Sequence, residues 1–230
     1  MTPNDSIPEK PSRPICGRCA RPRSACICRW ITPVQPIPEV LILQHPLESR
    51  QAKGSAPLLH LSLAGSRLAV GETFDDDELR RLLHAPVERE DAMAATQSGV
   101  CGPQEIHPVL LYPGTPEMPV SFVPGDYRSR PPGVFRLRLV ILDGTWRKSR
   151  KLLHLNPMLQ TLPRMSLQQV DTSRYSIRKA HAPDQLSTLE AACRALMQLE
   201  GNEAKYMPLL HAFEGFVNEQ LSRVPPRNCC

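Results

Sequence analysis

The residues best suited to chemistry follow an apolar run in the middle of the chain. After Leu137–Leu142 come Asp143, Gly144, Thr145 and Trp146, which supply a carboxylate, a flexible turn, a hydroxyl and a large aromatic ring. The run predicts a buried strand, and ligands of open α/β sheets bind at the carboxyl ends of the strands. Asp143 could therefore be a general base, or it could cap the next helix. Trp146 could stack on a base or pack in the core.

Four cysteines lie within a short segment near the N-terminus, at Cys16, Cys19, Cys26 and Cys28. Two close pairs of thiolates can wrap one tetrahedral ion, and a four-cysteine set favours zinc in a closed, structural site. Two disulfides or an iron–sulfur cluster remain alternatives. We expect residues 13–30 to form a compact knuckle that presents its arginines to RNA phosphates or packs against the main domain.

A third group of polar residues lies in the C-terminal half. Arg174, Arg178 and Lys179 could meet a carboxylate or a phosphate. Ser187 and Glu190 have the spacing of a capping box, which predicts that a helix starts there. The first amides of that helix suit an anionic group, although ordinary capping and surface charge explain the same residues.

The charge of the 230-residue chain is unevenly distributed, with a net charge of +5. Basic residues dominate 13–29 and 136–179, whereas acidic residues gather in 72–91. Two basic segments suggest a face that binds a polyanion such as nucleic acid, and the alternative is a solvated surface that binds nothing. The residues expected to contact RNA are Arg18, Arg21, Arg23, Arg147, Lys148, Arg150, Arg174, Arg178 and Lys179.

The composition is that of a globular protein, with 41% hydrophobic and 22% charged residues. No apolar run is long enough for a transmembrane helix, and the polar N-terminus lacks the apolar core of a signal peptide. We therefore expect a cytoplasmic protein with reduced thiols and no membrane partner. No obligate protein partner is evident, and a monomer is favoured.

Strands alternate with helices along the rest of the chain. Strands are predicted at 39–44, 109–112 and 137–142, and helices at 75–84, 145–153, from 156 onward, 187–199 and 208–223. Residues 92–106 and 121–133 are predicted loops, and 32–38 a stiff linker. This order predicts an α/β protein with a mostly parallel open sheet covered by helices on both faces. The absence of G-x-G-x-x-G argues against a Rossmann dinucleotide site.

The predicted organisation has four parts. Residues 1–12 are expected to be disordered, 13–30 form the zinc knuckle, 31–223 the main α/β domain and 224–230 a loose tail.

Together these segments resemble the DTW-domain family, the tRNA-uridine aminocarboxypropyltransferases. The matching pieces, in chain order, are Cys16-x2-Cys-x-Arg-Pro-x3-Cys-x-Cys28, His45-Pro-x-Glu48, Leu111-Tyr-Pro-Gly114, Asp143-Gly-Thr-Trp146, Asn156-Pro-x-Leu-Gln-x-Leu-Pro-Arg164, Arg174-Tyr-x-Ile-Arg-Lys179 and Leu186-Ser-Thr-Leu-Glu-Ala191. Each piece is weak alone, but the ordered set is specific. The resemblance implies a SPOUT-like fold whose C-terminal part is knotted around S-adenosylmethionine.

The resemblance also implies a reaction. Uridine N3 would attack the γ-carbon of the methionine moiety of S-adenosylmethionine, and methylthioadenosine would leave. The acceptor would be a tRNA uridine near the variable loop, at position 47 as in bacterial relatives. Because N3 carries a proton at neutral pH, a base is needed, and the resemblance favours Asp143, with Thr145 and Trp146 in the same catalytic turn.

The donor site implied by the resemblance draws on four parts of the chain. Its expected residues are Ser55, Leu111, Tyr112, Pro113, Gly114, Asp143, Gly144, Leu186, Ser187 and Thr188. Arg178 or Lys179 could grip the donor's carboxylate. The chain departs from the family at Lys53–Ala56, where an asparagine–threonine pair is usual, and Ser55 could replace the missing hydroxyl.

Two other functions fit the same residues. One is a SPOUT-like RNA methyltransferase that uses another carbon of the same donor. The other is a zinc-knuckle protein that binds RNA without catalysing a reaction.

Overall fold

The structure is a computed structural model that describes residues 14–49, 51, 53–87, 105–129, 136–167 and 186–222. Several expectations lie outside these ranges: the disordered N-terminus, most of the 92–106 loop, the loose tail, and the basic residues Arg174, Arg178 and Lys179. Residues 168–185, which precede the helix that starts near Ser187, also lie outside, so the expected knot stays a prediction.

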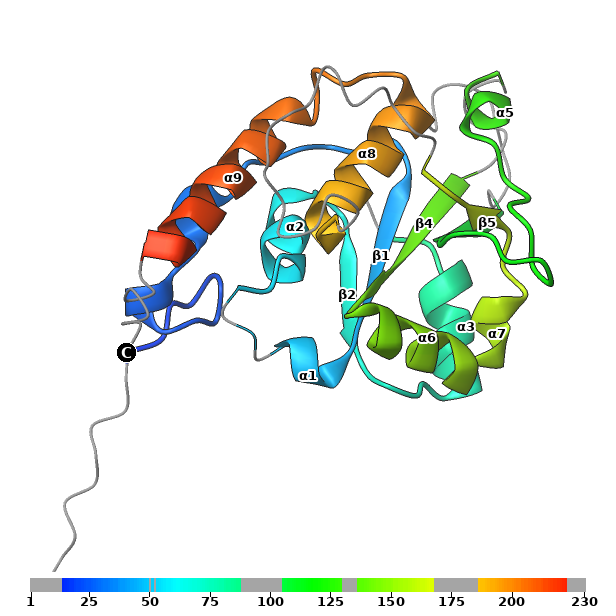
Figure 1. The fold of residues 1–230 in the computed structure, drawn as a ribbon, viewed down its shortest axis with the longest axis horizontal. Helices are drawn as coiled ribbons and strands as arrows, with labels where there is room; N and C mark the ends of the chain where they lie inside the picture. The colour runs from blue at the N-terminus through cyan, green and yellow to red at the C-terminus, as the bar shows by residue number, and fades with distance from the viewer. Residues whose placement is uncertain are drawn as a thin grey trace, which may run out of the picture.

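A parallel five-stranded sheet forms the centre of the described fold (Figure 1). Its strands are β1 (Glu39–Gln44), β2 (Arg67–Val70), β3 (Ile106–Leu111), β4 (Arg136–Asp143) and β5 (Arg164–Met165), in the spatial order β2-β1-β4-β3-β5. The three predicted strands are confirmed. The other two were missed because β2 is only half-buried and β5 has two residues, so neither leaves an apolar run of useful length.

The helices agree with the sequence where their signals are strong. The structure has α1 (Pro46–Ser49), α2 (Ala56–Ser62), α3 (Asp76–His84), α5 (Pro124–Arg128), α6 (Trp146–Leu155), α7 (Pro157–Gln160), α8 (Thr188–Glu200) and α9 (Met207–Ser222). The five predicted helices are confirmed. The prediction of a loop over 121–133 was wrong in part, because Pro124 starts the short helix α5. The sequence also missed α1 and α2.

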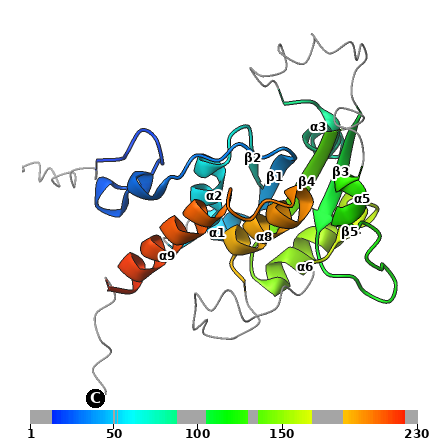
Figure 2. The ribbon, with the colours of Figure 1, turned by 90° about the horizontal axis from the view of Figure 1, so that it is seen from above.

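Alternating side chains of the sheet build two cores on its opposite faces. One core includes Val40, Ile42, Leu139 and Ile141 with residues of α2, α8 and α9. The other includes Leu41, Leu43, Val140 and Leu142 with residues of α3 and α7. Both faces are therefore covered by helices, as the alternation of strands and helices predicts, and Figure 2 shows α3 and α8 on opposite sides of the sheet.

The chain reverses its direction of winding between two central strands. β1 is followed by β2 on one side, whereas β4 leads through α6 and α7 to β5 on the far side. Neighbouring strands whose continuations leave in opposite directions open a crevice beyond their carboxyl ends. Gln44 and Asp143 are the paired last residues of these two strands, so the crevice begins at Asp143.

A buried ion pair lies at the amino-terminal edge of the same two strands. Arg138 donates from Nε to Glu39 Oε2 at 2.9 Å, and both side chains are buried. The guanidinium also donates to the carbonyls of Leu82 at 2.6 Å and Ala85 at 2.7 Å, which satisfies the end of α3. The Arg138 and Glu39 side chains at this edge are therefore bonded to each other and to the end of α3.

The cysteine-rich segment packs against the rest of the protein. Trp30 lies against α9 so closely that a Cβ at Gly215 would approach its ring to 2.3 Å. Trp30 Nε1 donates to Glu219 Oε2 at 2.9 Å. The segment 32–38, expected to be a linker, is tied down as well, because Val34 is buried and forms a parallel bridge with Leu63. Across the described ranges, no helix is both long and apolar enough to cross a membrane.

Candidate active site and metal centre

Asp143 ends β4 with its carboxylate on the face covered by α8. The side chain is 6% exposed. Gln44 Nε2 donates to Oδ2 at 2.8 Å, and Thr188 Oγ1 donates to Oδ1 at 2.5 Å. The two donors come from β1 and from the first residue of α8, so three elements that are distant in sequence meet at one carboxylate.

The alternative role of Asp143 as a helix cap is wrong. Asp143 is a strand residue, and the N-cap of α6 is Thr145, whose side chain makes no capping hydrogen bond. The carboxylate is held instead by Gln44 and Thr188, which positions it rigidly at the mouth of the crevice. Thr145 itself is exposed.

Burial raises the pKa of Asp143 above its ordinary value, while the hydrogen bonds from Thr188 and Gln44 oppose the shift. A raised pKa makes a carboxylate a stronger base. Each carboxylate oxygen has more than one lone pair, so the two existing hydrogen bonds still allow a further proton to be accepted.

The start of α8 is held by contacts that the sequence predicted only in part. Ser187 and Glu190 form the expected capping box. The amide of Leu189 donates to Ser55 Oγ at 3.4 Å, so buried Ser55 lies directly beside this helix start. The amide of Ser187 donates to Glu190 Oε2. The amides of Ser187 and Leu189, at the helix start that was expected to suit an anion, are therefore bonded within the protein.

An aromatic wall stands on the other side of the Asp143 turn. Trp146 is 55% exposed, so it is not a core residue. It meets buried Tyr112 edge-on, with 5.8 Å between ring centroids. Arg164 lies 5.3 Å from the Tyr112 centroid and donates to the carbonyl of Pro113 at 3.3 Å, which braces the expected Leu111–Gly114 turn.

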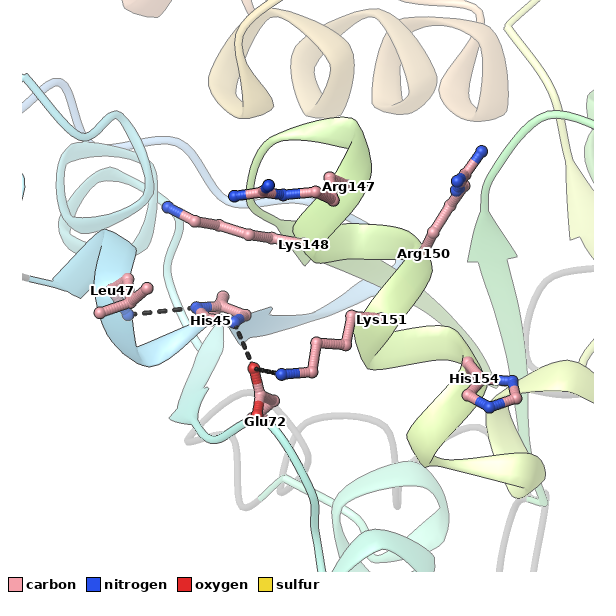
Figure 3. Close-up of a pocket in the computed structure, with 8 residues that line it drawn as sticks. All are labelled: His45, Leu47, Glu72, Arg147, Lys148, Arg150, Lys151 and His154. Atoms are coloured by element: carbon pink, nitrogen blue, oxygen red, sulfur yellow. Dashed lines mark hydrogen bonds and ion pairs between the residues drawn. The ribbon is translucent and has the colours of Figure 1, made fainter.

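A pocket of about 540 Å³ occupies the crevice between α1 and α6 (Figure 3). It is lined by His45, Leu47, Glu72, Arg147, Lys148, Arg150, Lys151 and His154. The amide of His45 donates to the carbonyl of Asp143 at 3.0 Å, so the pocket wall is continuous with the strand that carries Asp143. The sequence predicted Arg147, Lys148 and Arg150 only as RNA contacts, and it missed His45, Glu72, Lys151 and His154 as members of one pocket.

The floor of the pocket is an ordered ion network. The amide of Leu47 donates to His45 Nδ1, which leaves Nε2 to donate to Glu72 at 2.7 Å. Lys151 contacts the same carboxylate at 3.0 Å, as Figure 3 shows. Lys151 and His45 both lower the pKa of Glu72. On the neighbouring side, Lys148 pairs with Glu48 at 2.6 Å.

The four cysteines form a second, separate centre. Sγ of Cys16 and Cys28 are 3.6 Å apart, those of Cys19 and Cys26 3.8 Å, and all four sulfurs lie within 4.8 Å of one another. A tetrahedral ion with bonds of about 2.3 Å to sulfur separates its ligands by about 3.8 Å. The cluster therefore fits one metal ion. The alternative of two disulfides is wrong, because these cysteines are free and no sulfur pair is at bonding distance.

The turn that carries the first two cysteines is held by the backbone. The amide of Cys16 donates to the carbonyl of Arg21, and the amide of Ala20 donates to that of Cys16. Ala20 has φ +54°, the left-handed conformation that such a tight turn requires. Hydrogen bonds from the amides of Cys19 and Arg18 lower the pKa of Cys16 to about 6, which favours the thiolate that binds metals.

The arginines of the knuckle differ in their surroundings: some are exposed and others contact the main domain. Arg18 and Arg23 are exposed. Arg21 donates to the carbonyl of Gly54 at 3.3 Å and lies 6.0 Å from the Phe216 ring centroid, so it joins the knuckle to the main domain. Arg29 pairs with Glu219 on α9. Of the two roles expected for the knuckle, attachment to the main domain is therefore confirmed.

The chain is similar to several characterised proteins. It is 29% identical over 214 residues to tRNA-uridine aminocarboxypropyltransferase 2 of Mus musculus, covering 91% of this chain and 64% of that protein. It is 28% identical to the Drosophila melanogaster protein of the same name, covering 90% and 74%. With tRNA-uridine aminocarboxypropyltransferase A of Arabidopsis thaliana the identity is 26%, covering 94% and 85%. No solved structure matches the chain.

A family model describes this chain better than any single relative does. The chain spans less than two thirds of the mouse protein's length. The family model of the DTW domain, however, matches residues 13–221, which include the knuckle, both central strands and the helix start at Thr188. The chain therefore belongs to the DTW-domain family.

Proposed function

We propose that this protein is a tRNA-uridine aminocarboxypropyltransferase, which moves the 3-amino-3-carboxypropyl group of S-adenosylmethionine to N3 of a tRNA uridine. The observation that carries the proposal is the buried, hydrogen-bonded carboxylate of Asp143 at the switch point of a DTW-domain sheet. The similar proteins of Mus musculus and Drosophila melanogaster are named tRNA-uridine aminocarboxypropyltransferase 2.

Asp143 acts as the base in this proposal. The N3–H proton passes to its carboxylate as N3 forms a bond to the γ-carbon and the bond from that carbon to sulfur breaks. Methylthioadenosine leaves without charge, because the sulfonium takes up the electron pair of the broken bond. Thr188 and Gln44 hold the carboxylate in place, so its position is set before the uridine arrives.

The donor is proposed to lie between the start of α8 and the Leu111–Gly114 turn. In this arrangement Ser55, Leu186, Ser187 and Thr188 would line the first side, Tyr112, Pro113 and Gly114 would line the second, and Gly144 would contribute from the turn after β4. A Cβ at Gly114 would approach the amide of Val120 to 2.9 Å, so the close backbone at this turn requires glycine. A knotted C-terminal path, as in SPOUT-like folds, and contacts from Arg178 or Lys179 remain part of the proposal.

Trp146 is proposed to stack on the acceptor base. It is the largest exposed ring beside Asp143, and exposed aromatic side chains are the usual platforms for unstacked RNA bases. Thr145 and the exposed Arg18 and Arg23 would then contact the surrounding RNA.

Zinc is proposed as the ion of the four-cysteine centre. Four thiolates at tetrahedral spacing leave no open position, so the ion would stabilise the knuckle and take no part in transfer. The knuckle would then hold the N-terminal segment against α9 and the Gly54 carbonyl.

One assay separates the candidate functions. The protein is incubated with an unmodified tRNA transcript and S-adenosylmethionine labelled either in the carboxyl carbon or in the methyl group. Carboxyl label in the RNA is expected. Methyl label would replace the proposal with the RNA methyltransferase, and absence of both labels with RNA that still binds would favour the non-enzymatic RNA-binding protein.

A further inference from the structure

The basic pocket between α1 and α6 contains more positive charge than its own carboxylates balance. Its lining includes Arg147, Lys148, Arg150 and Lys151. Lys148 is paired with Glu48, and Lys151 with Glu72. Within the ranges that the structure describes, Arg147 and Arg150 have no acidic partner. Both guanidinium groups are exposed at the pocket and available to an anion.

These cations lie on two adjacent faces of α6. Arg147 and Lys151 are four residues apart and therefore neighbours on one face of α6, and His154 continues that face. Trp146 and Arg150 are also four apart and share the adjacent face, towards Tyr112. Burial raises the pKa of that tyrosine, and the positive charge of Arg150 is close enough to oppose the shift. A nucleotide whose base lies on Trp146 would thus have Arg150 beside it on the same face, and Arg147 and Lys151 on the next face.

The network on the floor explains why the pocket is preformed. Glu72 is fixed by His45 and Lys151 together, and it fixes the Lys151 ammonium at the rim. An arriving anion would meet a site that needs little rearrangement.

We propose that this pocket binds a phosphodiester of the acceptor RNA, next to the nucleotide whose base lies at Trp146. The inference rests on the proposed function for the identity of the RNA. It goes beyond that function by assigning a binding site to Arg147, Lys151 and His154, on a cavity that is continuous with Asp143 through the backbone of His45. Phosphate contacts fix register, so this pocket would determine which uridine reaches Asp143.

The test compares two matched double variants. R147Q/K151Q removes two cations from the pocket without bringing a new charge near Glu72. R80Q/R81Q removes two exposed arginines from α3, whose C-terminal end lies at the opposite edge of the sheet beside Arg138. Affinity for an unmodified tRNA transcript is measured by filter binding at several salt concentrations without S-adenosylmethionine, after thermal melts show that both variants fold.

The expected result is a loss confined to the pocket variant. R147Q/K151Q should bind the transcript about tenfold or more weakly, with a salt slope smaller by about one, because the loss of one neutralised phosphate lowers the slope by roughly one. R80Q/R81Q should keep the wild-type slope. Equal behaviour of the two variants would overturn the proposal.

A second measurement distinguishes the phosphodiester from the donor's own carboxylate. Calorimetric affinity for S-adenosylmethionine without RNA should be unchanged in R147Q/K151Q. Weaker donor binding with unchanged RNA binding would assign the pocket to the donor and overturn the proposal. If the wild-type protein transfers no carboxyl label while R147Q/K151Q still loses RNA affinity, the proposed reaction fails and the phosphate site stands.

Discussion

The four-cysteine knuckle and the Asp143 centre are built in opposite ways. The four sulfurs come from residues 16 to 28, and they converge through local turns, including the one held by Ala20. The Asp143 centre takes its parts from β1, β4 and α8, so its two hydrogen bonds span 99 and 45 residues of chain. A local site needs only its own segment to fold, whereas a distributed site needs the whole sheet.

The comparison predicts that metal loss is the largest perturbation and that it starts locally. Removal of the proposed zinc by a chelator should lower the melting temperature strongly, because structural zinc contributes about 10–16 kcal/mol in isolated fingers. A smaller contribution is expected here, since α9 also packs against the knuckle. Metal analysis and thermal melts follow the loss. Cys16→Ser should lose the metal, while Cys193→Ala, in the core of α8, should keep it. Full retention of the metal in Cys16→Ser would remove this cysteine from the site.

At the distributed site, one substitution should slow the transfer reaction greatly and leave the fold intact. Asp143→Asn keeps the shape of the side chain but cannot take a proton, so transfer should fall about 10²- to 10⁴-fold, as for loss of a general base. Steady-state transfer of carboxyl label measures the effect, and circular dichroism checks the fold. Transfer at the wild-type rate would leave Asp143 with a positioning role only.

The raised pKa of Asp143 predicts how the transfer rate and the stability of the protein depend on pH. Because burial raises its pKa in the folded state, transfer should decline on acidification at a higher pH than a solvent-exposed aspartate would give. The folded state also binds this proton more tightly than the unfolded state. Stability of the wild-type protein should therefore fall as pH rises from the unfolded pKa through the folded pKa, and the Asp143→Asn variant should lack that slope. Denaturant titrations at several pH values test the sign.

The smallest expected effect concerns the contact that joins the two regions. Arg21 of the knuckle donates to the carbonyl of Gly54. The next residue, Ser55, accepts at its Oγ from the amide of Leu189, which follows Thr188. Arg21→Ala should cost about 1–2 kcal/mol and speed hydrogen exchange over residues 54–59, since a partly buried carbonyl loses a charged donor. The exposed arginines offer matched controls, Arg18→Ala and Arg23→Ala. Identical exchange in all three variants would show that the two regions are independent.

The parts that sequence predicted well are those with a local signal. The run at Leu137–Leu142 and the capping box at Ser187 produced the expected strand and helix. The helix α5 and the strand β2 escaped, because a five-residue turn and four half-buried residues leave almost no periodic pattern. For the same reason nothing near Gln44 indicated a partner for Asp143, although Gln44 ends a predicted strand.

By itself, the sequence determined the cysteine set and the central strands, because spacing and periodicity are properties of neighbouring residues. The family followed from the resemblance of its ordered motifs. Only the tertiary structure excluded the capping role of Asp143, which sequence left between a cap and a base, and its action as a base stays a proposal. Parallel pairing sets Gln44 beside it, and packing of α8 brings Thr188 to its other oxygen. Tertiary packing also directs Arg21 to the carbonyl of Gly54 and forms the basic pocket at the switch point. Both depend on contacts between segments far apart in the chain.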